Sequence, residues 1–74
     1  MKMTAKEQLS RKLKVLRAKK GMTQDDLAKA SGVSKITIAI AEATGNNRIP
    51  SVDTLYKLAK ALEVDEKEFV KFAK

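Results

Sequence analysis

Apolar residues recur at helical spacing along the chain and are separated by short polar or glycine-containing breaks. The breaks fall at Gly21, at Gly32 and over residues 45–50, and each intervening segment has the length of a short helix. In the first segment Leu9 and Leu13 lie one turn apart and therefore share one helix face. The pattern predicts an all-α protein in which several short helices enclose a common core.

The helix starts are marked by residues that favour the N-cap position. The expected helices follow the caps Thr4, Thr23, Ser34, Ser51 and Asp65, and they end near Gly21, Gly32, Ala43, Leu62 and the last residue of the chain. Thr4 and Glu7 have the spacing of a capping box. The side chains of Val52, Leu55, Leu58, Ala59, Leu62, Val64 and Phe69 are expected to close the core over the first helix.

The third segment has two possible structures. Ile36, Ile38 and Ile40 alternate with smaller residues, and such a period of two is typical of a strand. A lone strand would have no partner for its backbone groups in an otherwise helical chain, so we predict a helix. If Ile38 and Ala41 are then buried, Ile36 and Ile40 point outward, and exposed isoleucines in a small domain call for an explanation.

Length and charge narrow the class of protein. A chain of 74 residues without cysteine suits one domain spanning residues 1–74, held by a hydrophobic core rather than by disulfides. Residues 1–20 hold eight of the sixteen bases and one of the nine acids, so they account for the whole net charge of +7. This basic segment favours an anionic partner, either nucleic acid or an anionic membrane, although a solvated helix would also explain it.

Membrane association and secretion are not favoured. The apolar stretches are far shorter than the roughly 20 residues that span a bilayer, and residues 1–4 lack the features of a secretory signal. Binding to a membrane through the first helix is also unfavourable, since Leu9, Leu13 and Leu16 are needed in the core. We therefore expect a cytoplasmic protein with no membrane partner.

Catalysis and metal binding are not expected either. The chain has no histidine or cysteine and no glycine-rich phosphate loop. Its acidic residues stand at helix starts, where they are explained by capping and by the helix dipole. We predict that the protein is not an enzyme and needs no cofactor and no metal.

The second and third helices carry the main functional signal. Gly32 and Val33 leave room only for a tight turn between them, which predicts a helix-turn-helix. The third helix is the only one without an acid in its first turn, where it has Lys35. Its N-terminus is therefore suited to an anion such as a phosphate.

At this point the sequence resembles the Cro and phage-repressor-like helix-turn-helix family, also called XRE-type. The resemblance rests on the strings LKVLRAKKGMTQDDLAKASGVSK and PSVDTLYKLAKALEVDEKEF. It implies a compact five-helix, lambda-repressor-like DNA-binding domain with the helix-turn-helix over about residues 23–44. It also implies a sequence-specific regulator of transcription, repressor-like and encoded by a bacterium or phage, that binds double-stranded operator DNA.

The resemblance further implies that the third helix enters the major groove while the second helix and the following loop contact the backbone. Gln24 would hydrogen-bond a phosphate or brace the third helix. The implied DNA-contacting residues are Gln24, Ser34, Lys35, Ile36, Thr37, Ala39, Ile40, Asn46, Asn47 and Arg48. The three apolar residues would pack against thymine methyl groups, whereas turn formation explains the two asparagines equally well.

The resemblance also implies that the C-terminal helix forms a homodimer on two half-sites, for which Tyr56, Val70 and Phe72 are the candidate contacts. The sequence departs from the family where Ala39 and Ile40 replace a small hydroxyl residue and an arginine or lysine. Without that base, specificity is expected to be modest or directed to A·T-rich sites. The alternative is that Ile36 and Ile40 bind a protein partner and that DNA is bound only nonspecifically.

Overall fold

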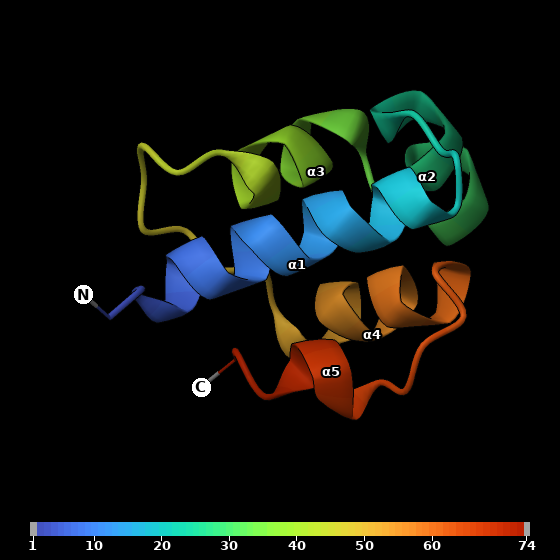
Figure 1. Cartoon of the computed structure of the whole chain (residues 1–74). Coiled ribbons are helices and arrows are strands. Elements are labelled where there is room, and N and C mark those ends of the chain that lie inside the picture. The colour runs from blue at the N-terminus through green and yellow to red at the C-terminus, as the bar shows by residue number, and fades with distance from the viewer. Residues whose placement is uncertain (1, 74) are drawn as a thin grey trace.

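The computed structural model describes residues 2–73, and within them the chain forms five helices and no strands (Figure 1). The helices are α1 (Ala5–Lys19), α2 (Gln24–Ser31), α3 (Lys35–Glu42), α4 (Val52–Ala61) and α5 (Lys67–Val70). The all-α expectation is confirmed. The strand alternative for the third segment is wrong, because this segment forms a regular helix.

The expected caps start four of the five helices. Thr4 and Glu7 form the predicted capping box at α1. Thr23 forms a second box with Asp26 at α2, in addition to the dipole effect of the acids there. The side chains of Ser34 and Ser51 accept the backbone N–H three residues ahead at α3 and α4. Each contact satisfies a backbone donor that the helix itself leaves free.

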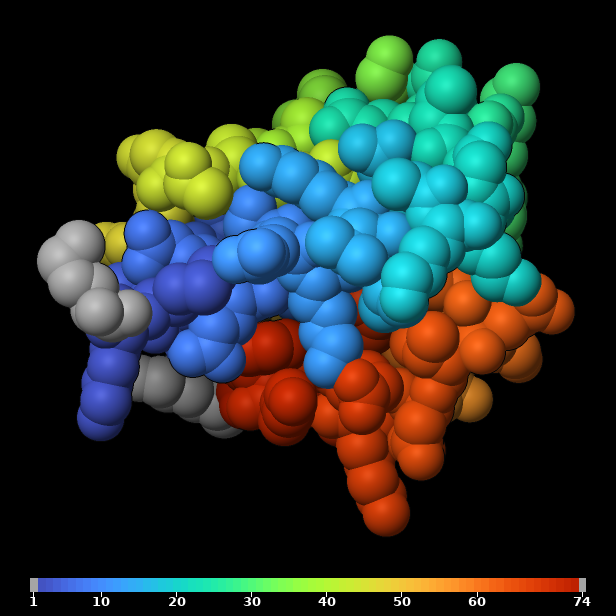
Figure 2. Space-filling model, viewed as in Figure 1, coloured from blue at the N-terminus to red at the C-terminus, as the bar shows by residue number. Residues whose placement is uncertain are grey.

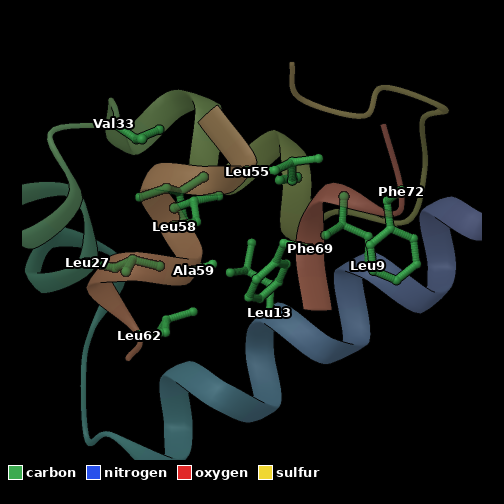
Figure 3. Packing of buried hydrophobic residues seen from close by; sticks show 12 residues of the cluster. Leu9, Leu13, Leu27, Val33, Leu55, Leu58, Ala59, Leu62, Phe69 and Phe72 are labelled. Carbon is green, nitrogen blue, oxygen red and sulfur yellow. The ribbon is translucent and has the colours of Figure 1, made fainter. Parts of the chain in front are cut away.

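The core lies between α1 on one side and α4 and α5 on the other, with α3 alongside α1 and α2 near the C-terminal end of α1 (Figure 1 and Figure 3). α1 packs on α3, α2 packs on both α3 and α4, and α5 packs on α4. The buried apolar side chains are Leu9, Leu13, Leu27, Val33, Ile38, Ala41, Leu55, Leu58, Ala59, Leu62, Phe69 and Phe72. Three of the expected core residues differ, since Leu16 and Val64 are only partly buried and Val52 is 53% exposed.

The C-terminal segment is less helical than expected. We predicted a fifth helix capped by Asp65 and continuing to the end, but α5 has four residues and a turn follows at residues 71–72. The Asp65 carboxylate does accept a hydrogen bond from the Lys67 backbone N–H at 2.9 Å. The turn brings the ring of Phe72 into the core, where it is 8% exposed. The backbone at Lys71 keeps helical angles, so Phe72 stands one turn after Phe69 and both rings are buried.

α1 runs across the middle of one face of the molecule, between α2 and α3 on one side and the C-terminal segment on the other (Figure 2). The side chains of α1 are therefore in reach of both halves of the fold. Among residues 2–73, no helix is long and apolar enough to cross a membrane.

Candidate nucleic-acid interface

The turn between α2 and α3 is tight, and each of its residues has a structural role. Gly32 ends α2 with a φ of 74°, in the left-handed region that favours glycine. Val33 is buried. The Ser34 hydroxyl accepts a hydrogen bond from the Thr37 backbone N–H at 3.1 Å and donates one to the Thr37 hydroxyl at 2.8 Å. The first turn of α3 carries no acid, as expected.

The two sides of α3 differ in what they expose. Ile38 and Ala41 are fully buried against the core, and they set the rotation of the helix about its axis. The opposite side exposes Lys35, Ile36 and Ala39. Ile36 is 73% exposed, more than any other large apolar side chain among residues 2–73. Its outward orientation was predicted from the sequence and is confirmed.

The expectation that Ile40 points outward is only partly met. Its side chain is half-buried, because the loop that follows α3 covers part of it. Together with Thr37, Arg48, Ile49 and Pro50 it lines an open hollow of about 350 Å³ between α3 and this loop. The apolar surface of α3 therefore continues onto Ile49 and Pro50, with Arg48 beside it.

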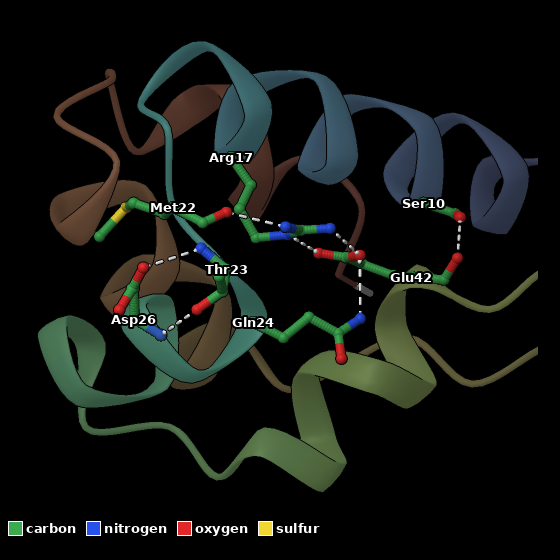
Figure 4. A network of polar contacts seen from close by, with 7 residues as sticks. All are labelled: Ser10, Arg17, Met22, Thr23, Gln24, Asp26 and Glu42. Atoms are coloured by element: carbon green, nitrogen blue, oxygen red, sulfur yellow. Dashed lines mark hydrogen bonds and ion pairs between the residues drawn. The ribbon is translucent and has the colours of Figure 1, made fainter.

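The C-terminal end of α3 is held by a buried carboxylate (Figure 4). Glu42 is 4% exposed. Its carboxylate accepts hydrogen bonds from the Arg17 guanidinium at 2.8 and 3.0 Å and from the Gln24 side-chain amide at 3.1 Å. The Ser10 hydroxyl donates to the Glu42 backbone carbonyl. Residues from α1 and α2 thus fix one end of α3.

The Arg17–Glu42 pair is bidentate, and this geometry makes a charge-assisted contact strong. Arg17 also donates to the Met22 carbonyl at 2.8 Å, just before α2 begins. The hydrogen bonds to Glu42 raise the pKa of the Arg17 guanidinium, so this side chain stays charged. A single arginine therefore ties α1 to the start of α2 and to the end of α3.

Lys6 holds the same end of α3 from the first turn of α1. Its side chain is 4% exposed. Its ammonium donates hydrogen bonds to the carbonyls of Ile40 at 2.9 Å and of Ala43, and to the Asn46 side-chain oxygen at 3.0 Å. Burial, and then the charge of Lys14, lower the pKa of Lys6. This buried cation satisfies carbonyls that the helix end leaves free, and it complements the negative end of the helix dipole.

Asn46 organises the loop after α3. Its side-chain oxygen accepts hydrogen bonds from Lys6 and from the Arg48 backbone N–H at 2.9 Å. Its side-chain amide also lies 3.4 Å from the Ile40 carbonyl. Of the two explanations open for Asn46, turn formation is the one that these contacts support. Asn47 and Arg48 are exposed on the same loop.

The remaining predicted contact residues lie around the exposed side of α3. Gln24 braces α3 through Glu42, the second of the two roles expected for it. The ammonium of Lys35 lies 3.3 Å from the Asp25 carboxylate, in a pair that is more than half exposed on both sides. Exposed pairs of this kind are worth little and are readily exchanged for another anion. The contacts of Gln24 and Lys35 with DNA remain predictions.

Sequence reasoning missed Lys6, Arg17 and Glu42 as the residues that position α3. The basic segment at residues 1–20 was interpreted as a surface for an anionic partner. Four of its eight bases instead make contacts within the fold: Lys6, Lys12 with Glu68, Arg17 with Glu42, and Lys20 with Glu63. A charged residue at the C-terminal end of a mostly apolar helix was the only signal for Glu42.

The candidate dimer residues lie apart from α3. Tyr56 is 42% exposed on α4, and Val70 is half-buried on α5. Phe72 does not fit the expectation of an interface residue, because its ring packs into the core of its own chain. The proposed dimer contact is thereby reduced to Tyr56 and Val70.

Comparison with known proteins agrees with this arrangement. A family profile described as helix-turn-helix, HTH_3, matches residues 13–69. A crystal structure of an HTH_3 family transcriptional regulator from Vibrio cholerae is similar, with a TM-score of 0.76 and 34% identity over 86% of the present chain. The present chain covers only 35% of that protein. A search of curated proteins gave no significant match. The chain belongs to the HTH_3 helix-turn-helix family.

Proposed function

We propose that this protein is a transcriptional regulator that binds double-stranded DNA sequence-specifically, with α3 in the major groove. The observation that carries the proposal is the exposed outer side of α3 in a domain of the helix-turn-helix family. A helix of this diameter fits the major groove, and its outward side chains then face the base edges. The whole domain, residues 1–74, serves this role.

The residues around α3 divide by the part of DNA that they would contact. Ile36 and Ala39 would face the bases together with Thr37 and Ile40, whereas Lys35, at the N-terminal end of α3, would contact a phosphate. Phosphates would be contacted by the backbone N–H of Ser34 and by the exposed side chains of Asn47 and Arg48. Gln24 and Asn46 would act chiefly by holding α3 and the loop in place.

The contacts at the inner end of α3 support this proposal. Recognition of base edges requires side chains held to within about 0.5 Å of the productive geometry. Lys6, Arg17 and Gln24 fix the C-terminal end of α3 through hydrogen bonds. The outer side of the helix is thus presented by a rigid support and not by a mobile loop.

We further propose a repressor-like regulator in the cytoplasm of a bacterium or phage-infected cell that binds as a homodimer to an operator of two half-sites. The dimer contact would involve Tyr56 on α4 and Val70 on α5. Sedimentation of wild type and Tyr56→Ala with and without operator DNA tests this proposal. Equal masses for the two proteins on DNA would rule out a role for Tyr56.

Selection of duplexes from a random DNA pool tests the proposed function. The pool is bound by wild type, by Lys35→Ala and Ile36→Ala on α3, and by two matched controls. Lys60→Ala removes an exposed base from α4, and Val15→Ala trims an exposed apolar side chain on α1. Both controls lie outside the residues assigned to DNA.

We expect wild type and both controls to enrich the same motif. Lys35→Ala is expected to weaken binding and to lower the log–log salt slope by about 0.9 if Lys35 neutralises one phosphate. Ile36→Ala is expected to relax the motif at one position. Salt-sensitive binding without any enriched motif would contradict sequence-specific recognition.

One observation favours a second function, in which α3 binds a protein. The 73% exposure of Ile36 leaves an apolar residue at the centre of the candidate interface, and such residues also mark protein contacts. A protein interface centred on isoleucine would show little dependence on salt, whereas binding to several phosphates would weaken steeply. Repeating the selection at two salt concentrations therefore separates the two functions.

A further inference from the structure

The outer side of α3 offers almost no side-chain group that can hydrogen-bond to a base. Ile36 and Ala39 are apolar and exposed, and Ile40 beside them is half-buried. The hydroxyls of Ser34 and Thr37 form a hydrogen bond with each other. The ammonium of Lys35 is turned toward Asp25 on α2. The side of a reading helix that meets the bases is thus mostly hydrocarbon.

We propose that α3 reads the C5-methyl groups of pyrimidines and does not distinguish a T·A pair from a pair of 5-methylcytosine with guanine. This proposal rests on the proposed function, since it concerns how the same helix chooses its DNA. If α3 reads DNA in this way, methylation of cytosine at C5 creates binding sites for this protein.

The reason lies in what each base pair presents in the major groove. Thymine carries an O4 acceptor and a C5-methyl group, whereas cytosine carries an N4 amino donor. Methylation at C5 gives cytosine the methyl group and leaves its amino donor unchanged. The two pairs then differ only in donors and acceptors. A helix side made of Ile36 and Ala39 has no polar group that senses this difference.

Thr37 and Lys35 do not restore the missing discrimination. A threonine hydroxyl can donate or accept, so it contacts any of the four bases, and Thr37 is half-buried. Lys35 stands at the N-terminal end of α3 and is directed to the side of α2. The base pairs opposite the middle of α3 are left to the apolar residues.

The apolar surface is wide enough to meet more than one methyl group. It extends from Ile36 over Ile40 to the hollow of about 350 Å³ that Ile49 and Pro50 also line. Arg48 lies at this hollow and provides a charge for the neighbouring phosphate. The surface therefore combines a hydrocarbon contact with a cation beside it, which suits DNA better than it suits an apolar protein segment.

The test uses three versions of one duplex that carries the motif selected from the random pool. The first keeps thymine at the steps that Ile36→Ala relaxes, the second has deoxyuridine there, and the third has 5-methylcytosine paired with guanine. Deoxyuridine removes only the methyl group. Each lost methyl contact is expected to weaken binding about fourfold, the ratio that matches burial of one methyl-sized group. The methylcytosine duplex is expected to bind within about twofold of the thymine duplex.

The variant Ile36→Ala is expected to bind the thymine and deoxyuridine duplexes with nearly equal affinity, while Val15→Ala behaves as wild type does. Ile36 is largely exposed, so its truncation should leave the fold intact, and a melting curve checks this. Equal binding of wild type to thymine and deoxyuridine duplexes would overturn methyl reading and leave sequence-specific DNA binding standing. Much weaker binding to methylcytosine than to thymine would show that hydrogen bonds also read the pair. If no duplex is enriched, the proposed function fails and this inference fails with it.

Discussion

The C-terminal end and the outer side of α3 both depart from the usual distribution of polar and apolar residues. The C-terminal end holds a buried carboxylate, Glu42, and a buried ammonium, Lys6, each with several hydrogen-bond partners. The outer side exposes Ile36 and Ala39. In a helix that serves only the fold, charges would face water and isoleucine would face the core.

The difference shows which residues serve the fold and which are left for a partner. Buried charges are costly unless they are paired and hydrogen-bonded, and both Glu42 and Lys6 are. Nothing in the fold satisfies Ile36 in the same way, because it makes no contribution to the core. An exposed apolar residue on a rigidly held helix indicates a surface that another molecule covers.

The largest expected effect is a loss of unfolding free energy, and it distinguishes two isoleucines that stand two positions apart on α3. Ile38→Ala removes a fully buried side chain and should lower the free energy of unfolding by about 4 kcal/mol. Ile36→Ala should change it by less than about 0.5 kcal/mol, since Ile36 is largely exposed. Urea denaturation measures both values. Similar losses for the two variants would mean that α3 is not oriented as described.

The next effect concerns the buried carboxylate. Glu42→Ala leaves Arg17 and Gln24 without their partner and should cost about 3 kcal/mol of unfolding free energy. The double variant Arg17→Met with Glu42→Leu should recover most of this loss, because it leaves no unpaired charge. Thermal unfolding of the single and double variants checks the prediction. A double variant as unstable as Glu42→Ala would contradict this explanation.

A smaller loss is expected when the buried ammonium is removed. Lys6→Met keeps an unbranched apolar side chain but removes the donor to the Ala43 carbonyl and the shortest of the hydrogen bonds to the Ile40 carbonyl, at a cost of about 2 kcal/mol. Hydrogen exchange should also quicken over the loop at residues 44–49. Lys14→Met on the exposed part of α1 is the control and should stay within about 0.5 kcal/mol of wild type. Equal stability of both variants would refute the positioning role of Lys6.

The smallest effect is a loss of stability in acid. The hydrogen bond from the Thr23 backbone lowers the pKa of Asp26 below its ordinary 3.8, and the bond from Lys12 lowers the pKa of Glu68 below 4.5. A lowered pKa in the folded state stabilises the protein above the ordinary value, and this contribution disappears as the pH falls through the folded value. Unfolding curves between pH 6 and pH 2 should therefore show a decline that begins near pH 4.5. Asp26→Asn should flatten it, and an unchanged decline would contradict the assignment to Asp26.

Local patterns were enough to predict most of the fold. Caps such as Thr4 and Ser51 act on backbone groups three residues away, so a short window of sequence contains both partners. The leucines of α1 and α4 likewise follow from helical spacing. The length of α5 did not follow, because no glycine or proline marks its end in the sequence.

The candidate site was predictable only on its outer side. Ile36 could be placed outward once Ile38 was placed inward, since the helix period relates them. The contacts of Lys6 with Ala43 and of Arg17 with Glu42 join residues that are 37 and 25 positions apart. No local pattern links such residues, and lysine or arginine in a basic helix has water as its usual surroundings. The residues that hold α3 therefore became visible only in the structure.

The central claim is that the outer side of α3 is the surface that meets DNA. Nuclear magnetic resonance of the isotope-labelled protein, titrated with a short duplex carrying the selected motif, tests it residue by residue. The predicted result is that amide shifts change over Ser34–Ile40, at Thr23 and Gln24 and around Arg48, while the outer side of α1 stays unchanged. Shifts centred on Arg11 and Lys14 of α1, with α3 unaffected, would contradict the claim.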